Sequence, residues 1–440
     1  MQRRILIAGG GFTGLTAAHR LSRVPGLSVS LWEKGNSLGG LAGGFQLGGH
    51  PIEKAYHCIF MSDTEIVRLA SELGLAENVI WRPASSGIYL QGRVHPFNRA
   101  MDLLRFAPCP WLDRIRTGLV ALYLKYRQHP EPFEAHRAME WMERRCGRGA
   151  ARTIWSPLLR GKFARYAPDV SMAWLWARLN IRARSRDGGG EKFGYFRGGF
   201  AVIADALTQS ARNAGAEITC GRSIAELYPV GSGVEVVDSA GTRETFDRVL
   251  FTGSSRAFRR LLEKSPSTPP SYLDQLGAVP YLNAICLVFA SRQELPAPFW
   301  LNVNEEGAPF LVLVHHTQMV PREWYGGLNV YYIGAYLDPQ APMYQLDDHA
   351  IERKWLDYLR QIYPEFDESR LVEKRLFRLT DAQHVVLPGH RAHIPEHRTP
   401  IPGVYLANFS QVYPEDRGTN FAVRDGERLA AMIRQDLAAG

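Results

Sequence analysis

Hydrophobic positions near the start of the chain change from a continuous run to a helical spacing and back. The segment 3–8, "RRILIA", is a short apolar run that predicts a buried strand. Apolar residues then recur at the spacing of one helix face, at Leu15, Ala17, Ala18 and Leu21. The segment "LSVSLWE" (27–33) predicts the next strand. This strand–helix–strand order is typical of a parallel α/β unit.

Similar patterns return in the middle and at the end of the chain. Phe200, Ile203, Leu207 and Ala211 predict an amphipathic helix, and 215–254 reads as strands separated by turns at Gly231–Gly233 and Asp238–Gly241. A short strand over 404–407 precedes a helix with apolar residues at Phe421, Ala422, Leu429, Ala430 and Ile433. We therefore expect an α/β fold with a Rossmann-like domain and a mixed α+β substrate domain, both discontinuous in sequence.

The expected domain boundaries follow from where the patterns change. The Rossmann-like domain would take 1–61, 187–270 and 387–440. The substrate domain would take 62–186, which is rich in helical signal and aromatic residues, and 271–386, which mixes strands with one helix.

Composition indicates an ordinary globular protein. Of the 440 residues, 45% are hydrophobic and 22% are charged, and no run of about 18 apolar residues occurs, so we expect no membrane span. We also expect no signal peptide, because the chain begins directly with a strand. The cysteines are scattered singly, which argues against a disulfide framework or a metal site and favours the cytoplasm, at Cys58, Cys109, Cys146, Cys220 and Cys286.

The formal net charge of +8 favours anionic partners. No nucleic-acid module is recognisable, so we expect no nucleic-acid partner. Anionic lipid and a phosphorylated substrate remain as alternatives, beside a basic surface that has no charged partner. Nothing in the sequence fixes the oligomeric state.

One segment, 111–129, combines an apolar side with a basic side. The apolar side contains Leu112, Ile115, Leu119, Leu122 and Leu124, and the basic side contains Arg114, Arg116, Lys125 and Arg127. We expect this helix to bury its apolar face in the substrate domain. The alternative is a helix that lies on a membrane surface.

A glycine motif follows the first strand. Gly9, Gly11 and Gly14 form G-x-G-x-x-G, and Glu33 ends the second strand 19 residues after Gly14. The glycines allow a tight turn, close approach of a pyrophosphate and close helix packing, while the carboxylate can bind a ribose hydroxyl. A solvated strand-end charge is the alternative for Glu33. The motif predicts a dinucleotide site without deciding between NAD and FAD.

The continuation "EKGNSLGG" decides between them. It contains the doublet Gly39–Gly40 and resembles the extension of FAD enzymes in the amine oxidase and protoporphyrinogen oxidase superfamily. The resemblance implies that the doublet lies near the phosphates and ribityl chain of FAD. It also assigns cofactor contacts to Phe12, Thr13, Lys34 and Leu41. A glycine-rich surface turn is the alternative for the doublet alone.

The end of the chain resembles the closing FAD motif of the same superfamily. A strand, Asn408, a loop and a helix follow one another, and the implied cofactor residues there are Gly418, Thr419, Asn420 and Phe421. The chain departs from the usual pattern in having Asn408 where an aspartate is common. In the middle of the chain, the resemblance places the backbone of Ile224 near the adenine. We therefore expect FAD as the cofactor.

The stretch "IEKAYHCIF" (52–60) is the best candidate for chemistry. It resembles a segment of UDP-galactopyranose mutases that ends in His–Ile–Phe, which implies that His57 lies beside the flavin. A histidine can move a proton near neutral pH. The alternative is a histidine held by a backbone carbonyl. For Glu53 and Lys54 we expect solvated surface positions.

A basic and aromatic cluster is the candidate substrate site. Arg160 and Lys162 lie close in sequence to Trp155, Phe163 and Tyr166, and such a mixture can bind a phosphate or carboxylate. The alternative is a basic helix end. Arg417, beside the closing glycine, is a further candidate for substrate contact.

These residues favour an FAD-dependent oxidoreductase that takes a hydride from a C–N or C–C bond of a sizeable, lipophilic or anionic small molecule. In the superfamily, oxygen or a quinone reoxidises the flavin. One rival is a redox-neutral enzyme resembling UDP-galactopyranose mutase, which acts on a nucleotide sugar. A second rival is a non-catalytic escort for isoprenoid groups, which the complete glycine set disfavours.

Overall fold

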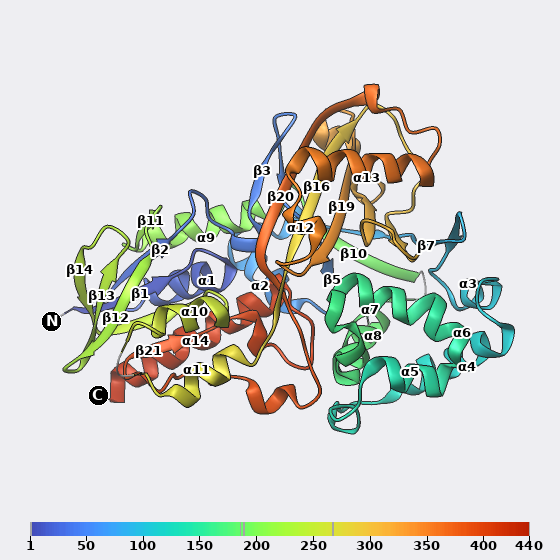
Figure 1. Cartoon of the computed structure of the whole chain (residues 1–440). Coiled ribbons are helices and arrows are strands. Elements are labelled where there is room, and N and C mark those ends of the chain that lie inside the picture. Colours follow the sequence, from blue (N-terminus) through green and yellow to red (C-terminus); the bar gives the residue numbers. More distant parts are fainter. Residues whose placement is uncertain (1, 185, 188–189, 266–267, 440) are drawn as a thin grey trace.

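The computed structural model describes residues 2–184, 186–187, 190–265 and 268–439. Three parts are visible in Figure 1: a parallel sheet with its helices on the left, a mixed sheet at the upper right and a helical lobe at the lower right. Both chain termini lie on the left, beside the parallel sheet.

The parallel sheet has five strands that come from distant parts of the chain. Their order across the sheet is β11 (Glu217–Cys220), β2 (Leu27–Glu33), β1 (Arg3–Ala8), β15 (Arg248–Phe251) and β21 (Val404–Leu406). All neighbouring pairs are parallel. In β1, Ile5 and Ile7 join one hydrophobic core while Leu6 joins another, so the strand is buried on both faces. Burial on both faces explains why its sequence reads as a continuous apolar run.

Helices and a small sheet cover the two faces. On one face, α1 (Phe12–Leu21) packs against α9 (Ala201–Asn213) and α14 (Thr419–Ala439). The core on the other face includes residues of a small antiparallel sheet and two helices, which are β12 (Ile224–Val230), β13 (Gly233–Asp238), β14 (Arg243–Phe246), α10 (Ser255–Leu262) and α11 (Pro270–Gly277). The Ser254 hydroxyl caps α10 by accepting a hydrogen bond from the Ala257 N–H.

The mixed sheet has seven strands. Their order is β20 (Leu371–His384), β16 (Tyr281–Ser291), β19 (Asn329–Leu337), β18 (Val312–His315), β17 (Trp300–Val303), β7 (Ser86–Leu90) and β8 (Arg93–Pro96). Only β17 and β7 pair in parallel. Alternate residues of β16 belong to different cores, because Leu287 packs with Trp355 of α13 (Asp348–Ile362) and Val288 joins the core that contains α1.

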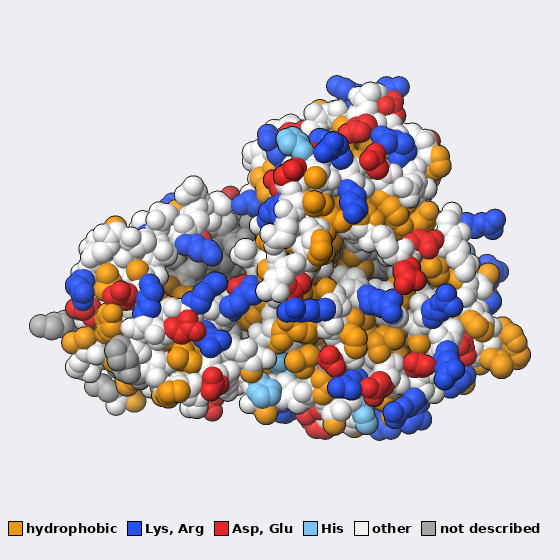
Figure 2. Space-filling model, in the orientation of Figure 1, with side chains coloured by type: hydrophobic (Ala, Val, Ile, Leu, Met, Phe, Trp, Pro, Cys, Tyr) orange, Lys and Arg blue, Asp and Glu red, His pale blue; other side chains and the backbone are white. Residues whose placement is uncertain are grey.

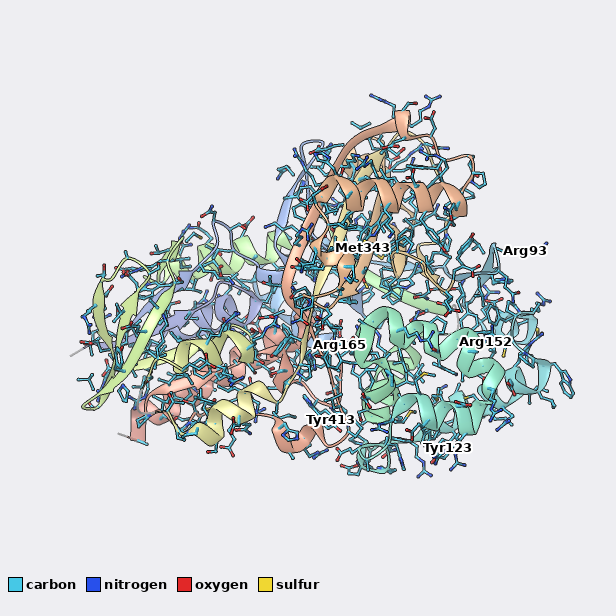
Figure 3. All side chains as sticks on the ribbon, viewed as in Figure 1. Arg93, Tyr123, Arg152, Arg165, Met343 and Tyr413 are labelled. Carbon is cyan, nitrogen blue, oxygen red and sulfur yellow. The ribbon has the colours of Figure 1, made fainter. Side chains whose placement is uncertain are left out.

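The helical lobe contains α3 (Ala100–Arg105), α4 (Trp111–Tyr126), α5 (Ala138–Cys146), α6 (Arg148–Ala150), α7 (Ser156–Phe163) and α8 (Met172–Arg184). A π-helical turn over Ala151–Trp155 joins α6 to α7. The lobe has its own core, which includes Phe133, Phe163, Trp174 and Trp176. Figure 3 shows Arg165 and Tyr413 at the junction between this lobe and the rest of the molecule.

Smaller elements connect the three parts. These are the hairpin β3 (Gly44–Leu47) and β4 (His50–Glu53), the helices α2 (Thr64–Glu72) and α12 (Pro342–Gln345), and a sheet of β5 (Ile59–Phe60), β10 (Gly190–Phe196), β6 (Val79–Pro83) and β9 (Arg186–Asp187). The predicted α/β class with a Rossmann-like sheet and a mixed sheet is confirmed. The exact division into two discontinuous domains stays a prediction.

The predicted burial of the apolar side of α4 is wrong. Of the five apolar residues on that side, Leu124 is buried, but Leu112, Ile115, Leu119 and Leu122 are exposed. The described part of the chain holds no helix that is long and apolar enough to cross a membrane.

Candidate functional site

The two glycine segments of the N-terminal unit lie against each other. The Gly39 N–H donates to the Gly10 carbonyl oxygen at 2.8 Å, and Gly11 forms an isolated parallel bridge with Gly39. Gly40 has a φ of +59°, and a Cβ atom placed on it would lie 3.0 Å from the Gly11 Cα. The doublet therefore forms one wall of the turn that begins α1, and a side chain at Gly40 would be strained in both backbone and packing.

The N-terminus of α1 presents backbone N–H groups to this turn. Gly11 is the N-cap residue, no side chain caps the helix, and its first turn contains no acidic residue. A Cβ atom on Gly11 would meet only the Gly40 Cα, at 3.9 Å, so open space lies in front of the helix. At Gly14, by contrast, a Cβ would lie 1.9 Å from the Gly9 carbonyl oxygen. Gly11 thus leaves room for a ligand, whereas Gly14 allows the helix to pack on the strand.

The Glu33 carboxylate lies beside the same turn. It accepts hydrogen bonds from the Gly10 and Gly35 N–H groups, both at 2.7 Å, and it is half-buried. These bonds hold the carboxylate at the strand end where a ribose hydroxyl would bind. Of the other predicted cofactor residues in this region, Lys34 is exposed, Thr13 and Leu41 are half-buried, and Phe12 is buried against Phe200. The Phe12 side chain is part of the core, so only its backbone is placed for a cofactor contact.

The closing motif uses two asparagine side chains inside the protein. The Asn408 Oδ1 accepts from the N–H and the hydroxyl of Ser410, and its Nδ2 donates to the Ser255 hydroxyl at 3.2 Å. The Asn420 Oδ1 accepts from the N–H groups of Glu65 and Ile66, so Asn420 caps α2. Both side chains stabilise the loop and the start of α14. Cofactor contacts at these two positions therefore fall mainly to the backbone.

The predicted surface position of Glu53 is wrong. This side chain is fully buried, where its carboxylate accepts from the Tyr195 hydroxyl and the Phe200 N–H, both at 2.5 Å. Burial raises the pKa of Glu53 to about 7. The residue ends β4, where both Ile52 and Glu53 are buried. Lys54, the next residue, is half-buried.

His57 lies next to Phe200 and within electrostatic reach of Arg417. Its Nδ1 is 2.8 Å from the Ala55 carbonyl oxygen, and its ring centroid is 5.4 Å from that of Phe200. Because a carbonyl only accepts, Nδ1 carries the proton and Nε2 is left as an acceptor. Burial, together with the positive charge of Arg417, lowers the pKa of His57 to about 4. The imidazole is therefore neutral at pH 7 and retains some accessible surface.

A cluster of charges lies beside the start of α14. Asp416 is buried; its Oδ2 lies 2.9 Å from the Lys162 Nζ and 3.9 Å from a guanidinium nitrogen of Arg178. Arg417 donates to the Gln383 Oε1 at 3.2 Å and to the Tyr336 hydroxyl at 2.8 Å. Burial alone would raise the pKa of Asp416, but Lys162, Arg178 and Arg417 together lower it far below its ordinary value. We call these four charged residues the charge cluster.

Two tyrosines complete this region, and the sequence analysis missed both. Burial opposes ionisation of Tyr336, but Arg417 and Lys162 outweigh it, so the pKa of Tyr336 is lowered. Tyr56 interacts with Tyr336, and burial raises its pKa well above the ordinary value. Tyr56 lies within the candidate stretch 52–60, directly before His57, and this position in the sequence could have indicated that it belongs to the site. Tyr336 gave no such signal, because it sits at the end of a strand far away in sequence.

The predicted basic pair on α7 is separated by the helix. Lys162 belongs to the charge cluster, whereas Arg160 is exposed. Two positions along an α-helix turn the side chain by about 200°, so the two residues point to opposite sides.

The remaining predicted cofactor residues lie in two other regions. Ile224 begins β12 and is half-buried beside the core of the small sheet. Gly418 is exposed, and Thr419 and Phe421 are half-buried at the start of α14.

Comparison with known families agrees with this geometry. A family model described as flavin containing amine oxidoreductase matches residues 12–433, from the first helix to the last. The chain belongs to this family. Members of this family are flavin-containing oxidoreductases, and the family implies a small-molecule substrate.

Individual members of the amine oxidoreductase family and related structures show how far the likeness extends. Coproporphyrinogen III oxidase of Mycobacterium leprae is 26% identical over 288 residues, which cover 60% of this chain and 62% of that protein. The chain thus aligns with about three-fifths of that curated relative. A candidate protoporphyrinogen oxidase from Exiguobacterium sp. 255-15 superposes with a TM-score of 0.80 at 20% identity, covering 99% of both chains. Reduced UDP-galactopyranose mutase superposes with a TM-score of 0.75 at 16% identity, covering 98% of this chain and 96% of that one.

The residues present fit FAD, the cofactor of the amine oxidoreductase family. The open space before Gly11 and the free N–H groups of α1 suit a pyrophosphate, and the Glu33 carboxylate suits a ribose. His384 is fully buried, and both its ring nitrogens lack a partner among the described residues. Asp416, Arg417 and Lys162 of the charge cluster lie within electrostatic reach of this imidazole.

Proposed function

We propose that this flavoenzyme oxidises a sizeable small molecule that carries carboxylates, by taking a hydride from a C–C or C–N bond. Bound FAD supplies the hydride acceptor. The residues we assign to substrate are Arg417, Lys162 and Tyr336, and we assign His57 to the flavin side of the site. The relative that acts on coproporphyrinogen III makes a porphyrinogen the first substrate to test.

The main support for this proposal is the net positive charge of the charge cluster. Three cations, Lys162, Arg178 and Arg417, lie around the Asp416 carboxylate. Asp63 also interacts with Arg178, so the cluster and this neighbour together have an excess of one positive charge. An alkylammonium substrate would be repelled there, because like charges interact strongly where water is scarce. A carboxylate would be attracted and could receive a charge-assisted hydrogen bond from Arg417.

The neighbouring polar groups have complementary roles in this proposal. His57 is neutral at pH 7, so its Nε2 can accept a proton that leaves the substrate. Tyr336, with its lowered pKa, holds Arg417 in place through the 2.8 Å hydrogen bond. Tyr56 packs edge-on against Trp300, with ring centroids 5.0 Å apart, and forms an aromatic wall.

The test is anaerobic reduction of the holoenzyme by coproporphyrinogen III and, separately, by putrescine, followed through the flavin absorbance. We expect reduction by the porphyrinogen alone. In Arg417→Gln we expect the substrate concentration for half-maximal rate to rise about tenfold or more, because one charged hydrogen bond is lost. Arg424→Gln is the control, since this arginine lies nearby in sequence, on α14, and pairs with Asp425. Reduction by putrescine, or equal effects of both substitutions, would contradict the proposal.

A redox-neutral reaction on a nucleotide sugar is the second candidate. It is supported by the structural likeness to UDP-galactopyranose mutase and by the same excess of positive charge, which suits a pyrophosphate. Conversion of a nucleotide sugar only after flavin reduction, without net use of electrons, would favour this candidate.

We also propose that the protein works in a reducing compartment such as the cytoplasm. All five cysteines are free thiols, and three of them are buried. Unpaired cysteines are typical of proteins that fold where thiols stay reduced.

A further inference from the structure

The exposed face of α4 is apolar along its whole length. Successive side chains of an α-helix are about 100° apart, so residues three and four positions apart share a face. Seven large apolar residues fall within one arc of about 120° on this basis: Trp111, Leu112, Ile115, Leu119, Leu122, Tyr123 and Tyr126. All seven are exposed. With Met101 and Leu104 of α3, which are also exposed, we call this surface the α4 face.

The α4 face concentrates apolar exposure at one place. It holds nine of the 14 large hydrophobic residues that are exposed in the described part of the chain. Trp111 is 64% exposed, Leu119 63% and Tyr126 72%. Figure 2 shows hydrophobic side chains gathered at the right-hand edge of the molecule, in the region of α3 and α4. Apolar surface of this extent on one helix marks a site of interaction.

The helix that carries this face is held firmly. The Leu124 carbonyl accepts hydrogen bonds from Trp176 and Asn180 of α8, both at 3.2 Å. On the other side, the Arg116 guanidinium donates to the carbonyl oxygens of Arg144 and Arg145. The apolar side chains therefore project from a fixed element and do not need a change in fold to reach a partner.

Basic side chains surround the α4 face. The segment 99–127 contains Arg99, Arg105, Arg114, Arg116, Lys125 and Arg127. It contains only two acids, and both are engaged by backbone N–H groups: Asp102 with Asn98 and Arg99, and Asp113 with Gly149. The surface around the apolar residues is thus positively charged.

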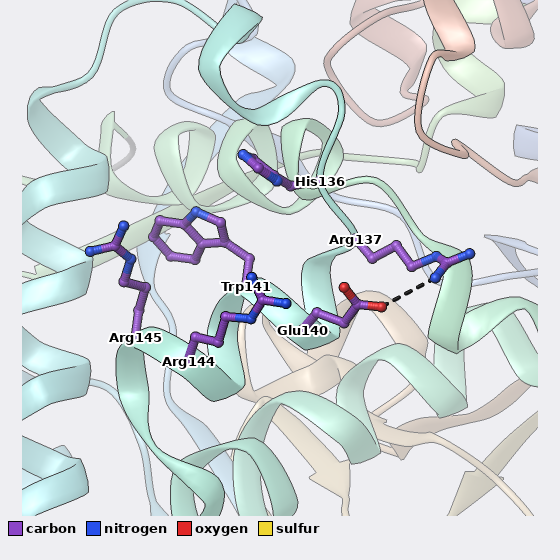
Figure 4. A pocket seen from close by; sticks show the side chains of 6 residues that line it. All are labelled: His136, Arg137, Glu140, Trp141, Arg144 and Arg145. Carbon is purple, nitrogen blue, oxygen red and sulfur yellow. Dashed lines mark hydrogen bonds and ion pairs between the residues drawn. The ribbon is translucent and has the colours of Figure 1, made fainter.

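A shallow basic pocket adjoins one edge of the face. His136, Arg137, Glu140, Trp141, Arg144 and Arg145 line a cavity of about 120 Å³ (Figure 4). The Trp141 ring stacks on Tyr123 of the α4 face, with centroids 6.4 Å apart, which makes pocket and face continuous. Glu140 is paired with Arg137 at 3.2 Å. The remaining arginines leave the pocket with a net positive charge that suits a phosphate group.

We propose that the α4 face docks on a lipid bilayer that contains anionic phospholipid, with the adjoining pocket at the level of the headgroups. An apolar arc led by a tryptophan and bordered by Lys and Arg is what a helix needs to lie in the interface. The basic border attracts the negative surface charge of such a membrane. A second copy of this chain fits less well, because a two-fold contact over this face would bring the two basic borders together.

The first test is flotation of the full-length holoenzyme with vesicles of phosphatidylcholine alone and of phosphatidylcholine mixed with phosphatidylglycerol. We expect flotation with the mixed vesicles and release at high salt. Leu119→Ser should lower the partition coefficient about tenfold, because one leucine side chain leaves the apolar phase. Leu346→Ser, a leucine that is 38% exposed on another surface, is the matched control and should bind as the wild type. Equal binding by both variants, or no flotation of the wild type, would overturn the proposal.

A second test separates lipid from self-association. Lys125→Gln together with Arg127→Gln should weaken flotation several-fold, whereas Lys354→Gln on α13 should not. Sedimentation of the wild type gives the mass in solution without lipid. A dimer that dissociates in Leu119→Ser, combined with no binding to mixed vesicles, would show that a second copy covers this face and would refute the membrane proposal.

Discussion

Glu53→Gln tests the account of the buried stretch before His57. The Glu53 carboxyl is fully buried and accepts hydrogen bonds from Tyr195 and Phe200. Two further tyrosines, Tyr325 and Tyr332, lie close enough for the charge of Glu53 to disfavour their ionisation. A glutamine has the same shape, keeps the acceptor for the Phe200 N–H, and can donate to the Tyr195 hydroxyl.

The magnitude follows from the pKa of Glu53, which is raised from 4.5 to about 7. The native state therefore holds a proton that the unfolded state has lost, so stability falls as pH rises between about 4.5 and 7. At about 1.4 kcal/mol for each pKa unit, the full loss is about 3 kcal/mol. The loss is absent below pH 4.5 and complete above pH 7. Glu53→Gln should not show it, because the amide does not ionise.

The assay is urea unfolding of both proteins at a fixed concentration of free FAD, from pH 5 to pH 8. Histidines with lowered pKa values, including His57 and His384, also change stability with pH, but they contribute equally to both proteins. The difference between wild type and variant isolates Glu53. We expect the variant to gain about 2.5 kcal/mol relative to the wild type between pH 5 and pH 8, because part of the loss has already occurred at pH 5. A difference that stays constant with pH, as expected for the exposed control Glu323→Gln, would refute the reasoning.

Four more substitutions test the site and its surroundings. Gly11→Val should fold but lose FAD, because the valine side chain would extend into the open space that we assign to the pyrophosphate. Gly14→Ala, by contrast, should be destabilised, because its Cβ would clash with the Gly9 carbonyl oxygen. Normal FAD content in folded Gly11→Val would contradict this account. His57→Ala should retain FAD but slow flavin reduction in stopped-flow traces, and unchanged kinetics would leave His57 a structural role. Lys162→Met should cost about 3–5 kcal/mol in urea unfolding, because buried Asp416 loses its closest cation. A cost under about 1 kcal/mol would show that the pair is effectively solvated.

The sequence predicted the parallel unit well because its signals are local. The strand at 3–8, the helix that follows and Glu33 lie within one short segment, where turn chemistry and periodicity agree. The strand and the helix of the closing motif were also predicted from the sequence, but the contacts of its two asparagine side chains were not. That Asn420 caps α2 depends on a contact with residues more than 350 positions away, which no local pattern contains.

Burial was harder to predict, because an amphipathic pattern shows two different faces but does not show which one meets the core. The helix 111–126 turns its apolar side outward, and the buried side holds Thr117 and Leu124. Glu53 was taken as a surface residue because its type is usually exposed, yet the packing of β4 places it among tyrosines. The charge cluster joins residues from α7, α8 and the loop before α14, so only the tertiary fold reveals it.

The most direct test of the central claim is the absorption spectrum of the purified protein, recorded anaerobically before and after coproporphyrinogen III is added, with the released cofactor identified by mass. The account predicts a tightly held FAD whose absorbance bleaches with the porphyrinogen and persists with putrescine. An FAD that only amines reduce would contradict the assignment of a carboxylate-bearing substrate.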